Sequence, residues 1–387
     1  MKPSQPKHSP SPSSAPARGR YDAWAVAAPG LESLLEAELR TLGFTDATAS
    51  TGGVRFACDG QGLVRANLHS RLASRVVVRL ASFKALAFHE LERAARRVEW
   101  TRMLAPGASY RLRVTAKKSR LYHSDAIAQR VGEAIERAVA GARRVDGPAR
   151  DEDESADETP HALGVAVDAP SAQLFVVRFE HDRCTVSADS SGALLHRRGY
   201  RQAVAKAPMR ETLAAAMLAA ARYDASQPLV DPFCGSGTLL IERLLAGPAA
   251  AAVGIDHDDD ALAAARDNLE AAGLTRRAAL VRADALHPSS WATGPGADVR
   301  PADLILADPP WGTLHGSHSG AAALHSGLLR AVHEVAADGA RLVVLTHEVK
   351  VMEAAVRAAD ALWRPRPPVR VYAKGHHPRI WVLDKLA

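Results

Sequence analysis

The chain has 387 residues, of which 47% are hydrophobic and 24% are charged, a composition typical of globular proteins with two or three domains. No apolar run approaches the ~20 residues that a helix needs to cross a bilayer, which excludes a membrane-spanning protein. Cys58, Cys184 and Cys234 lie far apart, which excludes a disulfide framework and a zinc-type spacing and indicates a reducing cytoplasm.

The net charge of +6 is unevenly spread along the chain. Residues 1–200 carry 29 Lys and Arg against 23 Asp and Glu, whereas residues 201–387 carry 20 of each kind. Within the first half, residues 65–144 hold 18 basic and 6 acidic side chains. This distribution favours a polyanion-binding module joined to a neutral unit. The alternative is a solvated basic face that has no partner.

The first 64 residues predict a tail followed by a small α/β unit. Residues 1–20 are basic and rich in Pro and Ser, with no apolar core, which indicates a disordered tail rather than a secretory signal. In residues 21–64, a strand from Tyr21 precedes the amphipathic helix "LESLLEAELRTLG", and "GGVRFACDG" predicts a second strand between glycines.

Residues 65–190 predict a second α/β unit. A helix runs into a strand in "GLVRANLHSRLASRVVVRL", and a helix, a strand and a further helix with Ser124 as its N-cap follow. Residues 141–170 are rich in Gly, Pro and acids, and we interpret them as a flexible insertion. "QLFVVRFEHDRCTVSAD" predicts a hairpin, and residues 191–204 form a linker.

Residues 205–387 alternate short apolar strands with helices, a pattern that predicts an α/β domain with a parallel, doubly wound sheet. The last segment, "VRVYAKGHHPRIWVL", predicts an antiparallel hairpin at the end of that sheet.

Carboxylates recur at the ends of four successive predicted strands in this domain. Asp231 precedes a glycine turn, Asp256 and Asp284 end the next two strands, and Asp308 follows the fourth. A glycine loop with an acid on the next strand is also found in dinucleotide-binding folds such as dehydrogenases. Four carboxylates would repel a pyrophosphate, however, and suit S-adenosylmethionine better. For Asp258 we prefer a structural role in a turn or as a helix N-cap.

The stretch "DPPWG" leaves the fourth strand through two prolines, which cannot extend a central strand. It resembles the (Asn/Asp/Ser)-Pro-Pro-aromatic motif of methyltransferases that act on exocyclic base amines. In that motif the carboxylate of Asp308 and the carbonyl of Pro309 would orient the amine, and Trp311 would stack on the base, so that catalysis is mainly positioning. The alternative is a rigid loop with Trp311 in the core.

Taken together, the two halves resemble the THUMP-containing RNA guanine-N2 methyltransferases, which include a bacterial enzyme for large-subunit ribosomal RNA and a tRNA-modifying branch. The resemblance covers residues 22–387 apart from the insertion, and its most specific pieces are "GLESLLEAELRTLG", "KKSRLYHSDAIAQRV", "DSSGALLHRRGYR", "DPFCGSGTLLIE" and "DPPWG". It implies a ferredoxin-like unit, a THUMP RNA-binding domain and a Rossmann-like class I methyltransferase domain that uses S-adenosylmethionine.

The resemblance also assigns site residues. The methionine end of the cofactor would be lined by Asp231, Pro232, Cys234, Gly235, Ser236 and Gly237. Its ribose would bind Asp256, and its adenine would contact Asp284 and Ala285. The catalytic loop would consist of Asp308, Pro309, Pro310 and Trp311. Glu211 and Thr212 would wall the cofactor, although helix capping explains these two residues equally well.

Two departures from the family are visible in the sequence. Family members often have Tyr at the position of Trp311, so the base pocket would be reshaped. Some ribosomal enzymes continue into a second methyltransferase domain, whereas this sequence ends at Ala387, so we expect one reaction.

Contacts to RNA are expected at two basic segments that include aromatic residues. The first segment holds Lys117, Lys118, Arg120 and Tyr122, and the second holds Arg197, Arg198, Tyr200 and Arg201. For each residue the alternative is an ordinary surface charge. His315, His318 and His325 follow the catalytic loop, and we interpret them as part of a solvated substrate loop rather than as metal ligands.

The sequence therefore predicts a cytoplasmic, monomeric, metal-free enzyme that methylates N2 of a guanine in 23S ribosomal RNA. The same chemistry on tRNA is the first alternative. A DNA adenine-N6 methylase shares the Asp-Pro-Pro-aromatic motif but leaves the THUMP-like half unexplained. A ribosome-assembly factor without catalytic activity is a further alternative.

Overall fold

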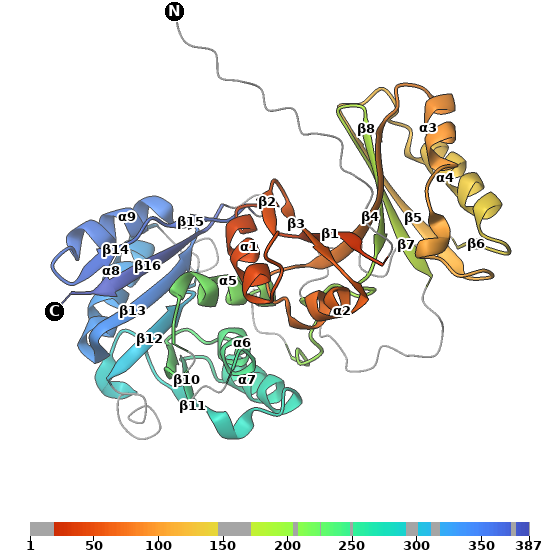
Figure 1. Cartoon of the computed structure of the whole chain (residues 1–387). Coiled ribbons are helices and arrows are strands. Elements are labelled where there is room, and N and C mark those ends of the chain that lie inside the picture. The colour runs from red at the N-terminus through yellow and green to blue at the C-terminus, as the bar shows by residue number, and fades with distance from the viewer. Residues whose placement is uncertain are drawn as a thin grey trace, which may run out of the picture.

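The computed structural model describes residues 19–145, 172–203, 208–224, 226–247, 251–291, 301–310, 318–372 and 377–386, which form two eight-stranded sheets (Figure 1). Most of the predicted tail and insertion lies outside these residues. The first sheet belongs to the N-terminal half, and the second belongs to the C-terminal half.

The first unit is ferredoxin-like, as its order of elements shows. Its elements are β1 (Tyr21–Val26), α1 (Glu32–Thr41), β2 (Thr48–Ser50), β3 (Gly53–Cys58), α2 (Gly60–His69) and β4 (Arg75–Lys84). The strand order β2-β3-β1-β4 with antiparallel pairing is that of a split βαβ fold. The predicted boundary at residue 64 is too early, because the unit needs α2 and β4, which pairs with β1 as far as Val78.

The second unit continues the same sheet through β4. Its elements are α3 (Phe88–Ala95), η1 (Trp100–Arg102), β5 (Ser109–Lys117), α4 (Ser124–Ala138), β6 (Arg143–Arg144), β7 (Gln173–Glu180) and β8 (Arg183–Asp189). The predicted hairpin is confirmed as β7 and β8. Helix α4 begins at Ser124, so its N-cap is His123 and the predicted cap was one residue late.

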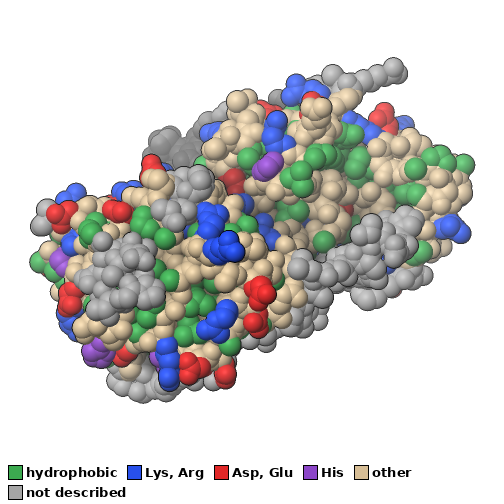
Figure 2. Space-filling model, turned by 90° about the horizontal axis from the view of Figure 1, so that it is seen from below, with side chains coloured by type: hydrophobic (Ala, Val, Ile, Leu, Met, Phe, Trp, Pro, Cys, Tyr) green, Lys and Arg blue, Asp and Glu red, His purple; other side chains and the backbone are tan. Residues whose placement is uncertain are grey.

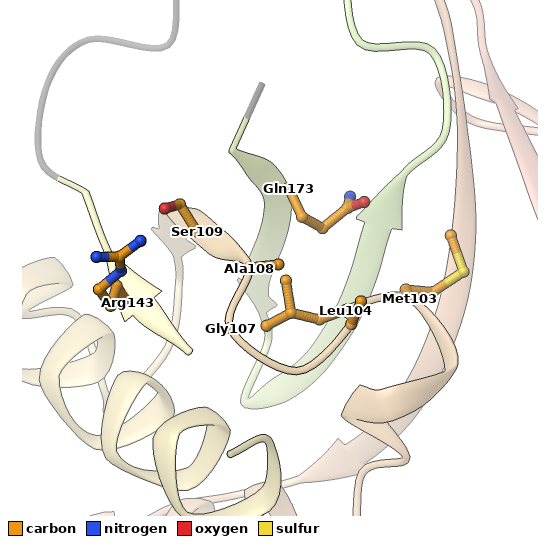
Figure 3. Close-up of a pocket in the computed structure, with 8 residues that line it drawn as sticks. Met103, Leu104, Gly107, Ala108, Ser109, Arg143 and Gln173 are labelled. Atoms are coloured by element: carbon orange, nitrogen blue, oxygen red, sulfur yellow. The ribbon is translucent and has the colours of Figure 1, made fainter. Parts of the chain in front are cut away.

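A small cavity of about 270 Å³ opens where β5, β6 and β7 begin (Figure 3). Its wall is formed by Met103, Leu104, Ala105, Gly107, Ala108, Ser109, Arg143 and Gln173. Arg143 is the charged member of this lining, so the cavity adds to the basic character of the second unit.

The C-terminal half is a doubly wound α/β domain. Its helices are α5 (Glu211–Ala221), α6 (Thr238–Leu245), α7 (Asp259–Ala271), α8 (His318–Val335) and α9 (Val349–Ala358), with short turns η3 (Thr275–Arg277) and η4 (Pro288–Ser290). Its strands are β9 (Leu229–Asp231), β10 (Ala252–Asp256), β11 (Ala278–Arg282), β12 (Ala302–Ala307), β13 (Ala336–Thr346), β14 (Trp363–Pro365), β15 (Val369–Arg370) and β16 (Arg379–Lys385).

The pairing of these strands confirms the predicted sheet. Strands β11, β10, β9, β12 and β13 are parallel neighbours in that order, and β16 closes the sheet antiparallel to β13, β14 and β15. Buried residues of α5, α6 and α7 pack on one face, and those of α8 and α9 pack on the other. Asp258 accepts a hydrogen bond from the backbone of Asp260 at the start of α7, so its predicted N-cap role is confirmed.

The ferredoxin-like unit packs directly on this domain. Leu35 and Leu39 of α1 belong to the same buried cluster as Ala214 and Leu218 of α5. At Gly30, where φ is +98°, an added Cβ would collide with the backbone oxygen of Arg370. The two units therefore share one hydrophobic core.

A buried carboxylate joins three parts of the chain at this interface. Glu242 of α6 is fully buried and accepts hydrogen bonds from Arg71 Nη2 at 2.5 Å, Arg198 Nε at 2.8 Å and Tyr200 Oη at 3.0 Å. Arg198 also donates to the backbone oxygen of Arg71. Since both arginines bind one carboxylate, removal of its charge leaves two cations partly buried without a counter-ion.

We expect Glu242→Gln to lower the free energy of unfolding by about 3 kcal/mol, because a buried pair that loses one partner is strongly destabilised. Urea unfolding followed by circular dichroism measures this change. Glu133→Gln is the control, because Glu133 is 46% exposed and meets Arg137 at 3.8 Å, so its loss should stay within about 0.5 kcal/mol. Equal free energies of unfolding for the two variants would contradict the role of Glu242.

Candidate active site

Four acidic residues meet at the carboxyl edge of the C-terminal sheet. Asp231 and Asp256 end the adjacent strands β9 and β10, Asp308 follows β12 on the other side of β9, and Asp284 follows β11. The chain order reverses between β9 and β12, and such switch points are where open α/β sheets bind ligands. The predicted alignment of the four strand ends is therefore present.

The glycine loop between β9 and α6 needs its glycines. Gly235 and Gly237 have φ values of +49° and +82°, which favour glycine. At Gly237, an added Cβ would also lie 3.3 Å from the Cβ of Ala265. The backbone nitrogen of Gly235 donates to Asp256 Oδ2 at 3.0 Å, so the acid on β10 holds the loop.

Asp231 is the most deeply buried of the four acids, with 1% of its surface exposed. Its Oδ1 accepts a hydrogen bond from the backbone of Phe233, whereas its Oδ2 has no hydrogen-bond partner among the described residues. Burial raises the pKa of Asp231 well above its usual value, and the charges of Asp308 and Asp256 raise it further. An unsatisfied buried carboxylate among other acids fits a ligand that carries positive charge.

Asp256 and Asp284 are held by turns. Both oxygens of Asp256 accept backbone hydrogen bonds, from Gly235 and Asp258, which leaves further lone pairs for a ligand. Asp284 is exposed and accepts from the backbone of Leu286 and from His287, and these bonds hold its pKa below the usual value. The adjacent Ala285 is 4% exposed.

The Asp-Pro-Pro stretch leaves the sheet at the switch point. Asp308 is half-buried, Pro309 is buried and Pro310 is exposed. The sheet register pairs Ala307 with Val344, so the loop starts beside the end of β13. Trp311 lies outside the described residues, and its predicted stacking role stays a prediction.

The thiol of Cys234 lies in the glycine loop and is 5% exposed. Burial raises its pKa well above the usual value, and Asp231 and Asp256 add to this shift. The thiol stays protonated, so Cys234 lines the loop without being a nucleophile. Pro232 and Ser236 are also buried there.

Two residues predicted to contact RNA are buried instead. Tyr200 is 4% exposed and bonds to Glu242, and Arg201 is 2% exposed and forms a 2.9 Å ion pair with Glu211. Arg198 is also bound to Glu242, so it belongs to the interface. The segment before the domain packs against α5 and α6. Its polar side chains therefore bond to Glu211 and Glu242 instead of facing solvent.

Glu211 and Thr212 begin α5 and are buried. Glu211 Oε1 accepts from Arg201 Nε at 3.0 Å, whereas its Oε2 has no hydrogen-bond partner among the described residues. Arg210 is the N-cap residue of α5, and its side chain makes no capping hydrogen bond. The acid therefore does more than begin a helix, since it holds Arg201 in the wall of the domain.

Asn268 is a residue that the sequence prediction missed. It is 1% exposed on α7, donates to the backbone oxygen of Ser236 in the glycine loop, and accepts from the backbone of Gln202 and Ala203. An amide on the apolar face of a helix is the signal that the sequence offered. Asn268 ties the segment before the domain to the glycine loop.

The first basic segment lies on the second unit. Lys117, Lys118, Arg120 and Tyr122 are all exposed, and the Tyr122 ring packs 4.1 Å from His123. Arg197 is half-buried. The exposed group remains available to an external partner.

His325 is buried within helix α8, so the prediction that it belongs to a solvated loop was wrong. His325 is 1% exposed and lies between the backbone oxygen of Ala321 and the hydroxyl of Thr346, while His315 and the side chain of His318 lie outside the described residues. Within the described ranges, no group of three or more His, Cys, Asp or Glu side chains is placed to hold a metal. None of the described helices is long and apolar enough to cross a membrane.

Comparison with protein families identifies two parts of the chain. Residues 198–379 match the family model described as "RMKL-like, methyltransferase domain". This part of the chain is therefore similar to the RMKL-like methyltransferase domains. Residues 22–77 match the RlmL ferredoxin-like domain, which agrees with the end of the first unit within β4.

Relatives of the chain are RNA methyltransferases by name. It is 34% identical over 219 residues to "Putative RNA methyltransferase slr0064" of Synechocystis sp., covering 57% of this chain and 53% of that protein. It is 29% identical over 347 residues to "Ribosomal RNA large subunit methyltransferase K/L" of Vibrio cholerae, covering 78% of this chain and 45% of that protein. The chain thus spans about half the length of these curated relatives.

The solved structure of TrmN from Thermus thermophilus is similar over nearly the whole chain. Its TM-score is 0.75 at 26% identity, and the match covers 95% of this chain and 100% of TrmN. The arrangement of the N-terminal units and the methyltransferase domain is therefore shared with a known protein.

We expect Gly237→Ala to weaken the binding of S-adenosylhomocysteine about tenfold or more. Alanine is strained in the left-handed conformation of Gly237, and its Cβ would crowd the Cβ of Ala265. Isothermal titration calorimetry measures the affinity. Gly339→Ala is the control, since Gly339 has φ +75° with nothing within 4 Å of an added Cβ and lies near the opposite end of its strand. Equal affinities for the two variants would contradict the assignment of the loop.

Proposed function

We propose that the chain is an S-adenosylmethionine-dependent RNA methyltransferase that modifies the exocyclic N2 amine of a guanine, in 23S ribosomal RNA, in the cytoplasm. The observation that carries the proposal is the Asp308-Pro-Pro stretch at the switch point of a methyltransferase sheet, beside the buried carboxylate of Asp231. The K/L relative, whose name specifies large-subunit ribosomal RNA, supports the choice of substrate.

The site fits the cofactor electrostatically. When bound, S-adenosylmethionine supplies an electrophilic methyl group on a positively charged sulfur. The unsatisfied Oδ2 of Asp231 is suited to accept hydrogen bonds from the ammonium group of the cofactor's methionine end. The bent loop of Gly235 and Gly237 leaves room for the methionine part of the cofactor. The carboxylate of Asp256 would accept from the ribose hydroxyls, with Asp284 and Ala285 near adenine, and Thr212 would lie in the wall.

The chain's own residues would prepare the amine. Its lone pair is delocalised into the base, so it needs orientation toward the methyl group. The carboxylate of Asp308 and the backbone oxygen of Pro309 accept hydrogen bonds from the two amine protons, which directs the lone pair. The nitrogen would gain the methyl group as the bond between that carbon and the cofactor sulfur breaks, which leaves S-adenosylhomocysteine, and it would release one proton to water. Pro309 and Pro310 keep these acceptors fixed, and Trp311 would stack on the base.

The second unit would bind the RNA. We assign residues 78–189 to a THUMP domain, because they lie between the two matched ranges and carry the exposed Lys117, Lys118, Arg120 and Tyr122. The shared core and the Glu242 pairs hold the ferredoxin-like unit against the C-terminal domain, and the second unit continues its sheet through β4 and β8. We expect the protein to act as a monomer.

The proposal is tested with labelled S-adenosylmethionine and rRNA or tRNA that lacks the modification. We expect label in N2-methylguanosine of 23S rRNA, and a loss on the order of 100-fold for Asp308→Ala, because the amine is no longer oriented. S-adenosylhomocysteine binding should be retained in that variant. Label in tRNA alone would move the substrate to tRNA, and label in N6-methyladenine of DNA would contradict the proposal.

We also expect the affinity for S-adenosylhomocysteine to rise with pH. The raised pKa of Asp231 means that the protonated form persists above pH 3.8, and this form cannot hold an ammonium group as an ion pair. In the free protein, the same group stabilises the fold at low pH and loses this contribution as pH rises through its raised pKa. Calorimetry from mildly acidic to neutral pH should show the rise, and Asp231→Asn should flatten it. An unchanged slope in that variant would contradict the role of Asp231.

A further inference from the structure

One face of the N-terminal sheet is left without helices among the described residues. Val78 pairs with Ala23 on one side and with Ala188 on the other, so these three side chains share a face. Helices α1 and α2 pack on this face in the first unit, and α3 and α4 pack on it in the second, as the two buried clusters show. We call the opposite side the open face.

Strand alternation gives the open face a strong positive charge. It carries nine basic residues against the three acids Asp22, Glu180 and Asp189, and of these Arg75 and Asp189 are buried as an ion pair. The basic residues are Arg55, Arg75, Arg79, Lys84, Arg111, Arg113, Lys117, Arg178 and Arg183. By contrast, the methyltransferase lobe seen from below mixes Lys and Arg with Asp and Glu (Figure 2).

The centre of the open face is a cluster of three arginines. The guanidinium of Arg79 lies 4.0 Å above the ring of Trp24, Arg55 bonds to Asp22 at 2.7 Å, and Arg178 is 59% exposed. Burial lowers the pKa of Arg79, and the nearby charges of Arg55 and Arg178 lower it further against the opposing charge of Asp22. These cations repel one another, and a bound anion would relieve that repulsion.

The open face is long enough to contact several phosphates of one nucleic-acid strand, rather than a single anion. From β3 to β5 it crosses β1, β4, β8 and β7, which is five strand spacings or about 24 Å. At the end of β5 it reaches Lys117, which continues into the exposed Lys118, Arg120 and Tyr122. Guanidinium groups bind phosphate oxygens through paired hydrogen bonds, so a chain of phosphates is the partner whose charge and length match.

We propose that the open face binds the phosphate backbone of the substrate RNA, with Arg79 and Arg178 at its centre. This inference rests on the proposed function and adds a surface to it. The contacts are to phosphate, so they position the RNA without reading its sequence. The base to be methylated is then delivered by a unit that the Glu242 pairs hold against the methyltransferase domain.

The experiment compares two double variants with the same change of charge. Arg79→Gln with Arg178→Gln alters the open face, whereas Arg40→Gln with Arg137→Gln removes two exposed charges, 55% and 61% exposed, from α1 and α4 on the covered side. The affinity for a 23S rRNA transcript is measured against KCl concentration. We expect about tenfold weaker binding for the first variant and a slope of log K against log salt that falls by about 1–2, with the control near wild type.

Three results decide the proposal. Arg79→Lys with Arg178→Lys keeps both charges, so a retained salt slope supports phosphate binding, whereas a slope as low as that of the Gln variant would overturn it. Equal binding by the Gln variant and its control would also overturn it. Calorimetry with S-adenosylhomocysteine checks that each variant is folded. A wild-type protein that neither binds nor methylates RNA would instead remove the proposed function itself.

Discussion

The arrangement of this protein depends on one buried carboxylate. Glu242 lies on the helix that follows the glycine loop, and it binds Arg71 of the ferredoxin-like unit and Arg198 of the connecting segment. Bringing two arginines and an acid out of water is costly, so such a cluster is better suited to specifying a geometry than to adding stability. Here it specifies how the N-terminal units stand relative to the C-terminal sheet.

A second constraint acts at the edge itself. Asp231, Asp256 and Asp308 lie close enough for their charges to raise the pKa of Asp231, an arrangement that is unfavourable without a ligand. A cofactor with an ammonium and a sulfonium group offsets that repulsion. The site concentrates negative charges that a cationic ligand would neutralise. The open face likewise concentrates positive charges that an anionic ligand would neutralise.

The sequence predicted the methyltransferase half well, because strand and helix alternation fixes a parallel sheet and parallel strands end at one edge. The four acids could therefore be placed together from their positions alone. The prediction from sequence failed where the hydrogen-bond or strand partners of a residue lie far apart from it in the chain. Tyr200 was expected at an RNA surface because its acceptor, Glu242, is 42 residues away. The boundary at residue 64 failed for a similar reason, since β4 belongs to two units and only its pairing reveals this.

Nucleoside mass spectrometry of RNA from cells with and without this chain tests the proposed activity most directly. We expect N2-methylguanosine at one position of large-subunit rRNA to disappear when the chain is absent. It should return with the wild-type chain but not with Asp308→Ala. Unchanged N2-methylguanosine in both rRNA and tRNA would contradict the assignment of this protein as an RNA guanine-N2 methyltransferase.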